Sequence, residues 1–440
     1  MSQLDDFRNS AFTYFNHLSG NMDAAGKTTS PVYPNPNVAG GQSNNYWQIG
    51  NVFDTMTDYL YQDANSGSPK VNSHQIASFM KNSLDLYYYL VLKNHNGCWY
   101  DDFAWWGIAC SKAFDSKYDS IFGVFKLRYQ QVALSTWDIM KNGKYDDVHH
   151  GAPNAWATCD QETFSICRPR FNGGVWQYDI FADKRPKALE PSPSNPSTPI
   201  AEGGYQAAGL GPFQDTVVNG LYFVMANRMV AAGWETQQTV DAIYNFTNSW
   251  LNDASLDAGT RWCQDVTGGK LMRERVSTYS NPSDKVHGFI PELSWSGDQG
   301  LLMAALSAYD KNSSQPWIEN MVLDIMNGMA GSVKETNGAN TYIMPWYPLT
   351  NNHLDSIDPG DYCSGLGVFM RYLNEVYLND ATVKAKLDDV NNPMRTLVVE
   401  TATTVQNDAL PDWLPNWDQG DIFGPFNKLS AMVTAISILQ

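Results

Sequence analysis

The sequence predicts an all-α protein, an (α/α)6 barrel in which six inner helices are surrounded by six outer ones. Three observations lead to this prediction. Twelve segments carry apolar residues at helical spacing, convincing alternating strands are scarce, and segments that are apolar all round tend to alternate with amphipathic ones. The predicted helices span residues 3–18, 45–62, 74–94, 101–115, 119–141, 215–233, 235–253, 297–310, 315–334, 361–378, 380–406 and 424–439.

The two kinds of helix indicate two rings. Residues 236–251 carry one apolar stripe opposite a row of Gln, Asp and Asn, whereas 215–230 and 300–309 are apolar nearly all round and fit inner positions. A helical solenoid, the alternative, would need a repeat of fixed length, but the spacing is irregular and the segments 142–214 and 254–296 interrupt it. We therefore expect one domain over residues 1–440, with those two segments as loops over one end of the barrel.

Polar and aromatic motifs stand at the starts of the predicted inner helices. Because inner helices of such a barrel run parallel, all six starts reach the same rim, where they would form a ligand pocket. The motifs are NNYWQIGNVFD at 44–54, WYDDFAWW at 99–106, QDTVVNG at 214–220, SWSGDQG at 294–300, DYCSGLG at 361–367 and GDIFGPFNKLS at 420–430.

Charge and composition narrow the classes of partner. The formal net charge is -17 and no basic run interrupts it, which argues against nucleic acid and anionic membrane surfaces. Only 17% of residues are charged while 13% are aromatic, a balance that suits neutral, hydroxyl-rich ligands such as carbohydrate, although core packing explains it equally well.

Other classes lack their motifs. No apolar run approaches the roughly 20 residues needed to cross a bilayer, and the opening residues lack a signal-peptide pattern. The chain has no Gly-rich phosphate loop and no C-x-x-C pair, and His149-His150 lacks the spaced companions of a metal site. We expect a monomer without metal or cofactor.

Two adjacent carboxylates, Asp101 and Asp102, stand in the most aromatic stretch, GCWYDDFAWWGIACSKAF. Such a pair is the usual equipment of glycoside hydrolysis, and a helix start could ionise one carboxylate while aromatic surroundings raise the pKa of the other. A close pair favours retention of configuration. The alternative is an ordinary helix cap, which is our interpretation of Asp5-Asp6; Asp146-Asp147 fits a solvated loop.

The sequence resembles glycoside hydrolase family 76, the α-1,6-mannanases, over nearly its whole length. The family motif of Asp-Asp followed by Ala-Trp-Trp is matched at residues 101–106, its Gly-Gly-aromatic segment at 172–178, and its later helix starts around Asn219 and at Asp298-Gln299. Three further motifs, NYWQIGNVFDTMTDYLY, SGLGVFMRYL and FGPFNKLSAM, follow the family order. Asp298 stands where the family usually has Asn, and the insertion 179–214 is longer than expected.

The resemblance implies endo-hydrolysis of α-1,6-linked mannan with retention, with Asp101 as nucleophile and Asp102 as acid/base. It also favours a secreted or periplasmic protein whose leader is absent from this chain. The residues expected to contact substrate are Trp47, Tyr100, Trp105, Trp106, Trp176, Asn219, Asp298 and Gln299. Two alternatives stay open: a fungal cell-wall type of transglycosidase that passes the glycosyl group to a sugar, and a non-catalytic carbohydrate-binding barrel.

Overall fold

The computed structural model describes residues 2–27, 46–88, 100–142, 174, 191–192, 195–199, 216–251, 262–274, 293–313, 316–349, 361–407 and 423–440. Its main helices are α1 (Gln3–Lys27), α2 (Tyr46–Ala64), α3 (Ser73–Tyr87), α4 (Tyr100–Ser111), α5 (Asp119–Phe122), α6 (Lys126–Asn142), α8 (Thr216–Ala231), α9 (Gln237–Leu251), α10 (Ser296–Ser313), α11 (Pro316–Ser332), α12 (Gly365–Asn379), α13 (Ala381–Asp388), α14 (Pro393–Gln406) and α15 (Phe423–Leu439). None of these helices is both long enough and apolar enough to cross a membrane.

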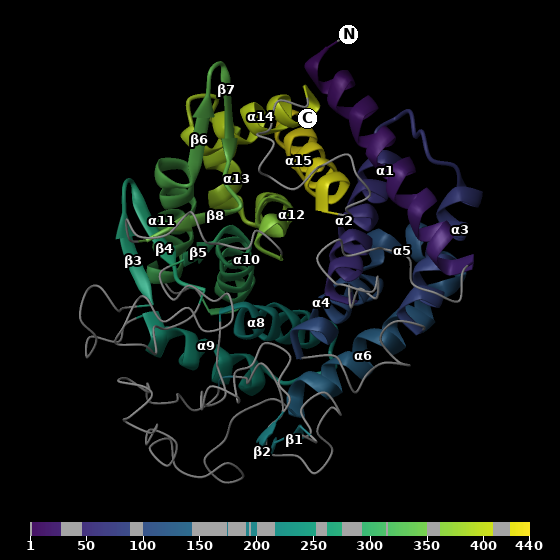
Figure 1. The fold of residues 1–440 in the computed structure, drawn as a ribbon, viewed down its shortest axis with the longest axis horizontal. Helices are drawn as coiled ribbons and strands as arrows, with labels where there is room; N and C mark the ends of the chain where they lie inside the picture. The colour runs from purple at the N-terminus through teal and green to yellow at the C-terminus, as the bar shows by residue number, and fades with distance from the viewer. Residues whose placement is uncertain are drawn as a thin grey trace.

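Six helices form a closed inner ring (Figure 1). α2 packs against α4, α4 against α8, α8 against α10, α10 against α12, α12 against α15, and α15 returns to α2. The outer layer consists of α1 against α15, α3 against α1, α6 against α4, α9 against α8, α11 against α10, and α13 and α14 against α12 and α15. The closed ring confirms the (α/α)6 prediction and excludes the solenoid.

The helix predicted for 380–406 is two helices. Asn392 caps α14 by accepting hydrogen bonds from the N–H groups of Met394 and Arg395, and Pro393 occupies the first helical position, where its missing N–H costs nothing. The predicted helix at 119–141 is also interrupted, because Gly123 has a φ of +50° and regular helix resumes only at Lys126.

Short strands, which the sequence did not predict, cover one side of the barrel. β3 (Cys263–Val266) pairs with β4 (Gly269–Met272), β6 (Lys334–Asn337) with β7 (Asn340–Ile343), and β5 (Leu293–Trp295) with β8 (Trp346–Pro348), all antiparallel. A further pair joins β1 (Pro191–Ser192) and β2 (Asn195–Pro199). The expectation of loops is therefore wrong for β1 and β2 in segment 142–214 and for β3, β4 and β5 in segment 254–296.

The hairpin β3–β4 lies against the outer helix α11. A side chain at Gly269 would collide with the backbone of α11 at Asp324, and one at Gly328 would collide with the backbone of Lys270. Glycine on both sides lets strand and helix backbones touch.

Charged side chains bridge the helices inside the inner ring. Asp54 of α2 pairs with Arg371 of α12 at 2.8 Å and with Lys112 at 2.5 Å, and Lys112 also pairs with Asp58 at 2.5 Å. The side chains of Asp54 and Arg371 are 1% and 2% exposed, so both charges depend on each other rather than on water. We call Asp54, Asp58, Lys112 and Arg371 the inner charge network.

Loss of one member of the Asp54–Arg371 pair should be severely destabilising. Arg371→Ala leaves the carboxylate of Asp54 buried with one cation fewer, which we expect to lower the free energy of unfolding by about 3–5 kcal/mol in urea titrations. Lys81→Ala, which breaks the exposed Lys81–Asp85 pair, is the control and should cost less than about 0.5 kcal/mol. Equal effects of the two changes would contradict the role given to the network.

The same charges predict acid sensitivity. Burial raises the pKa of Asp54, but the cations Arg371 and Lys112 outweigh it and hold that pKa below its ordinary value; burial and Arg228 act in the same way on Glu375. Because both folded-state pKa values are lowered, the stabilisation is complete above about pH 5, where the unfolded-state carboxyls are also ionised, and is lost as pH falls from there through the lower folded-state pKa values. The urea midpoint should drop between about pH 5 and pH 3, and less steeply in Glu375→Gln; an unchanged midpoint would refute the linkage.

Candidate active site

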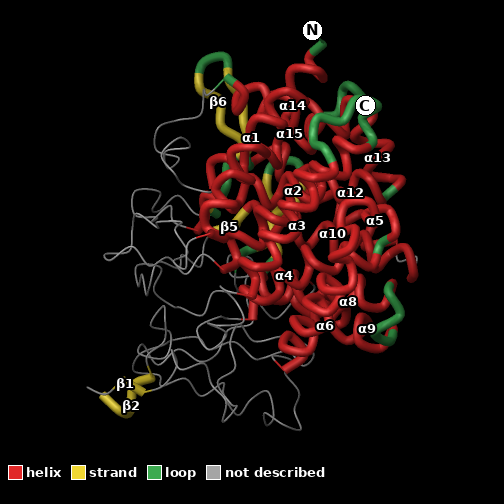
Figure 2. Tube along the Cα trace, turned by 90° about the vertical axis from the view of Figure 1, so that its right-hand side faces the viewer, coloured by secondary structure: helices red, strands yellow, loops and turns green. Residues whose placement is uncertain are grey.

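The starts of the inner helices meet on one face of the barrel. Trp295, which precedes α10, donates its indole N–H to the carbonyl of Tyr362, just before α12, at 3.1 Å. At the start of α12, the N–H of Gly367 donates to Asn427 of α15 at 2.6 Å. Figure 2 places β5, which leads into α10, at the left edge of the helical body, the face turned to the viewer in Figure 1. The expected common rim is therefore present.

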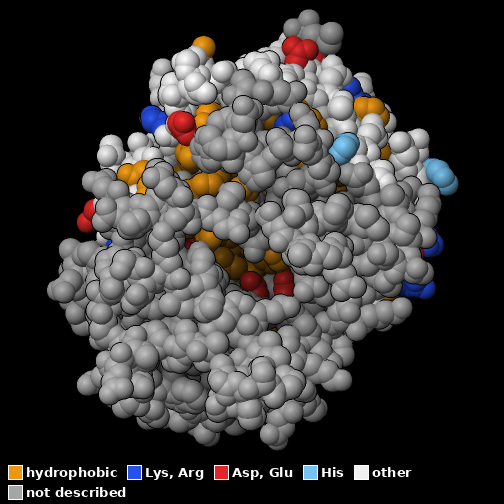
Figure 3. All heavy atoms as spheres, viewed as in Figure 1, with side chains coloured by type: hydrophobic (Ala, Val, Ile, Leu, Met, Phe, Trp, Pro, Cys, Tyr) orange, Lys and Arg blue, Asp and Glu red, His pale blue; other side chains and the backbone are white. Residues whose placement is uncertain are grey.

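The aspartate pair lies in the first turn of α4, on the inner ring. Asp102 is 9% exposed and Tyr100 7%, whereas Asp101 is only half-buried. Consecutive helical residues point about 100° apart, which explains why the two residues differ in exposure. Figure 3 shows a hollow near the centre of the same face, with acidic and hydrophobic side chains inside it.

Trp105, one turn further along α4, lies beside aromatic side chains at the starts of α2 and α10. Its ring lies 6.1 Å from that of Trp47 of α2 and 6.4 Å from that of Trp295, edge-on to the latter. The guanidinium of Arg371 lies 5.6 Å from the same ring. Trp105 is 2% exposed, so its observed role is to position α4 against α2, α10 and α12.

Trp106 was predicted as a sugar platform, and the structure places it in the core instead. It is 0% exposed and packs against Phe53 at 5.8 Å and Tyr87 at 5.4 Å, so no face of its ring is open to a ligand. Trp47 is half-buried and stays a candidate platform. Trp176 lies outside the described residues.

Gln299, an expected substrate contact, has its amide hydrogen-bonded within the protein itself. Its side-chain oxygen accepts from the N–H of Met272 at 2.8 Å, and its amide nitrogen donates to the carbonyl of Met272 at 2.9 Å and to Ser294 Oγ at 3.0 Å. Gln299 thus ties β4 to the start of α10. Asp298 is 0% exposed and Asn219 of α8 is 4% exposed.

Glu274 is a buried carboxylate at the rim that sequence reasoning missed. It follows β4, is 6% exposed, and its side chain accepts a hydrogen bond from the Tyr362 hydroxyl at 2.6 Å. Its backbone bonds to Thr216, where α8 starts, and to Leu293 of β5. From the sequence, Glu274 could have been placed on this face only by predicting that residues 263–272 form a hairpin. Among the described residues, no group of three or more His, Cys, Asp or Glu could hold a metal ion.

Comparison with solved structures identifies the fold. No protein-family model matches the sequence, and no curated protein matches it. An α-1,6-mannanase of family 76 from Salegentibacter sp. HEL1_6 has 15% identity and a TM-score of 0.53, over 96% of this chain and 99% of that one; this structure is an inactive variant, with two consecutive aspartates changed to asparagine, in complex with α-1,6-mannotriose.

Two further structures agree. A family 76 glycoside hydrolase (mannosidase) from Bacteroides thetaiotaomicron has 12% identity and a TM-score of 0.53, over 98% of each chain. Dfg5 from Chaetomium thermophilum, in complex with glucosamine, has 11% identity and a TM-score of 0.53, over 89% of this chain and 80% of that one. The molecule is therefore a helical double-ring barrel. More particularly, it has the fold of the glycoside hydrolase family 76 structures.

The assignment of Gln299 to structure rather than ligand binding can be tested. Gln299→Ala leaves the N–H and carbonyl of Met272 without their partners, and we expect it to lower the free energy of unfolding by about 1–3 kcal/mol in urea titrations. Gln237→Ala, which removes an exposed bond to Asp241, should change it by less than about 0.5 kcal/mol. A Gln299→Ala protein of unchanged stability would return this residue to the list of candidate ligands.

Proposed function

We propose that this chain is a family 76 glycoside hydrolase that cleaves α-1,6-linked mannan internally with retention of configuration. The observation that carries the proposal is the position of Asp101 and Asp102, in the first turn of an inner helix of the barrel. The Salegentibacter mannanase has the same fold, and its variant with two consecutive aspartates replaced is inactive. The pair in this chain is also consecutive and lies beside aromatic side chains that could hold a sugar.

Asp101 is proposed as the nucleophile and Asp102 as the acid/base. The more accessible carboxylate of Asp101 would attack the anomeric carbon while Asp102 protonates the departing glycosidic oxygen, so the bond to the leaving sugar breaks as the bond to Asp101 forms. Asp102, now ionised, would then take a proton from water, whose oxygen displaces Asp101 from the anomeric carbon. Two displacements at one carbon restore the original configuration.

The surroundings of the pair suit a neutral polymer. The half-buried Trp47 supplies aromatic surface near the first turn of α4, and the acidic chain as a whole would repel anionic polymers. We further propose that the protein acts as a monomer, outside the cytoplasmic membrane, where mannan would be met.

Transglycosylation is the second candidate. Its support is the shared fold with Dfg5, which was solved with a sugar, glucosamine, bound. Both reactions begin with the same glycosyl transfer to Asp101 and differ only in whether water or a sugar hydroxyl completes it. A non-catalytic sugar-binding barrel is the third candidate. It does not explain the pair of adjacent carboxylates, which binding alone does not require.

Asparagine variants test the two carboxylates. Asp102→Asn should lower release of reducing ends from debranched α-1,6-mannan by about 10²–10⁴-fold, and Asp101→Asn by at least as much, because each removes a group that acts on the reacting bond. Binding of an α-1,6-mannan oligosaccharide, measured by calorimetry, should persist in both. Asp146→Asn/Asp147→Asn changes an equally adjacent pair and serves as the control. A wild-type protein that binds but releases no reducing ends would overturn the enzyme proposal.

Product analysis tests both the stereochemistry of the reaction and the acceptor of the glycosyl group. In NMR spectra of early hydrolysis the α-anomer should appear first, since a double displacement retains configuration. With excess mannose oligosaccharide as acceptor, product length distinguishes the candidates: free reducing ends support the hydrolase, and longer chains support the transglycosidase. Initial release of the β-anomer would exclude the covalent route through Asp101.

A further inference from the structure

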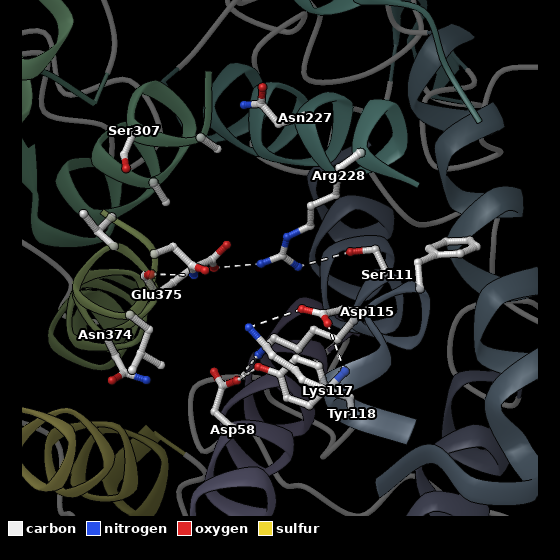
Figure 4. A pocket seen from close by; sticks show the side chains of 18 of the residues that line it. Asp58, Ser111, Asp115, Lys117, Tyr118, Asn227, Arg228, Ser307, Asn374 and Glu375 are labelled. Carbon is white, nitrogen blue, oxygen red and sulfur yellow. Dashed lines mark hydrogen bonds and ion pairs between the residues drawn. The ribbon is translucent and has the colours of Figure 1, made fainter. Parts of the chain in front are cut away.

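A cavity of about 430 Å³ lies at the opposite end of the barrel from the aspartate pair. It is lined by the last residue of α4, the second halves of α8, α10 and α12, Asp58 of α2 and part of the segment 112–118 (Figure 4). Ser111 in its wall follows Asp101 by ten residues, which corresponds to about 15 Å along α4. Its volume is within the range of small-molecule sites, and it shares no residue with the candidate active site.

The charges that line this cavity cancel. Arg228 pairs with Glu375 at 2.7 Å, as Figure 4 shows. Lys112 pairs with Asp58 at 2.5 Å, and Lys117 with Asp115 at 3.3 Å. The lining thus holds three cations and three anions, in a chain with a net charge of -17. Since each charge already has an opposite partner, the cavity offers an incoming ion little attraction, and an uncharged ligand fits it better.

Six uncharged polar side chains line the cavity beside seven apolar ones. The polar residues are Ser111, Ser307, Tyr118, Asn227, Asn374 and Asn379, and all but Tyr118 lie on inner helices. Tyr118 already donates to Asp58 and Ser307 to Asp380, but their oxygens keep lone pairs that can accept from a ligand hydroxyl. A ligand that also carries several hydroxyls matches this lining.

A half-buried phenylalanine in the cavity wall lies beside an exposed tryptophan. Phe114 lines it, and the ring of Trp234 lies 6.2 Å from that of Phe114. Trp234 is 56% exposed, the largest apolar side chain among those that the described part of the chain leaves open to solvent. A flat ring beside a cavity lined by charged pairs, hydroxyls and amides is the combination that holds the apolar face and the hydroxyl edge of a sugar together.

We propose that this cavity is a second carbohydrate-binding site, which takes a neutral mono- or disaccharide independently of the aspartate pair. The choice of mannose-based probes rests on the proposed function, whereas the neutral, hydroxyl-rich character of the ligand rests on the lining alone. The site binds sugar on the far side of the barrel and takes no part in bond cleavage.

Calorimetry on a non-cleaving protein tests the proposal. In the Asp101→Asn/Asp102→Asn double variant, mannose and α-1,6-mannobiose are titrated to about 10 mM, which reaches weak sites. Ala231→Trp, added to that protein, places a large side chain at an exposed position of the cavity wall and should abolish one binding site; Trp234→Ala should weaken the same site about 10-fold or more. Val390→Ala, another exposed apolar truncation, should leave both sites unchanged.

The outcomes separate the two proposals. Sugar binding that is insensitive to both Ala231→Trp and Trp234→Ala, or no binding of either probe, would overturn the second site. Displacement of the sugar by ammonium or phosphate ions would also overturn it, since the cavity would then prefer ions. In the active protein, Ala231→Trp should leave cleavage of short oligosaccharides within about 2-fold of wild type. Absence of cleavage by the wild type would count against the proposed function alone.

Discussion

Asp54 and Arg371 face each other inside the inner ring, and the arrangement of the helices around them depends on that contact. The pair links α2 to α12, and Lys112 extends it to the end of α4. Arg228 joins α8 to α12 through Glu375 and to α4 through the carbonyl of Ile108. Apolar surfaces alone allow neighbouring helices to slide by a turn, whereas buried charges satisfied in only one arrangement set the position of each helix along the barrel axis.

Arg371 also connects this interior to the candidate active site. Its guanidinium lies 4.5 Å from the ring of Tyr372 and 5.6 Å from that of Trp105. Trp105 follows the aspartate pair within one helical turn and contacts Trp47 and Trp295. Arg371, Trp47 and Trp295 thus hold Trp105, and with it the first turn of α4, in one orientation. Two carboxylates that act together need this rigid support.

The sequence was informative where local pattern determines structure. Helical spacing located the inner helices, and Asp101 and Asp102 were found because they stand at the start of one. Asn392-Pro393 is a local signal for the break before α14, but helical periodicity continues on both sides of it and favours one long helix. These features depend on neighbours a few residues away.

Other features depend on contacts with residues far away in the sequence, which local patterns do not predict. Gln299 has the appearance of a ligand at a helix start, but its partners belong to a strand 27 residues earlier in the chain. Trp106 is a core residue only because Phe53 and Tyr87, from two other helices, surround it. Glu274 reaches the rim only because β3 and β4 pair and turn the chain back toward α8. Tertiary contacts of this kind override local expectation.

The seam between α2 and α15 has a consequence for how the protein is made. Thr55 and Ser430 hydrogen-bond across it at 3.2 Å although 375 residues separate them, and Gln62 donates to the carbonyl of Val433 at 3.0 Å. While the ribosome is still adding residues, α2 remains with one apolar flank uncovered until α15 has emerged. Nascent chains therefore carry an incomplete ring for most of their synthesis, and this flank is the surface that a chaperone would be needed to shield.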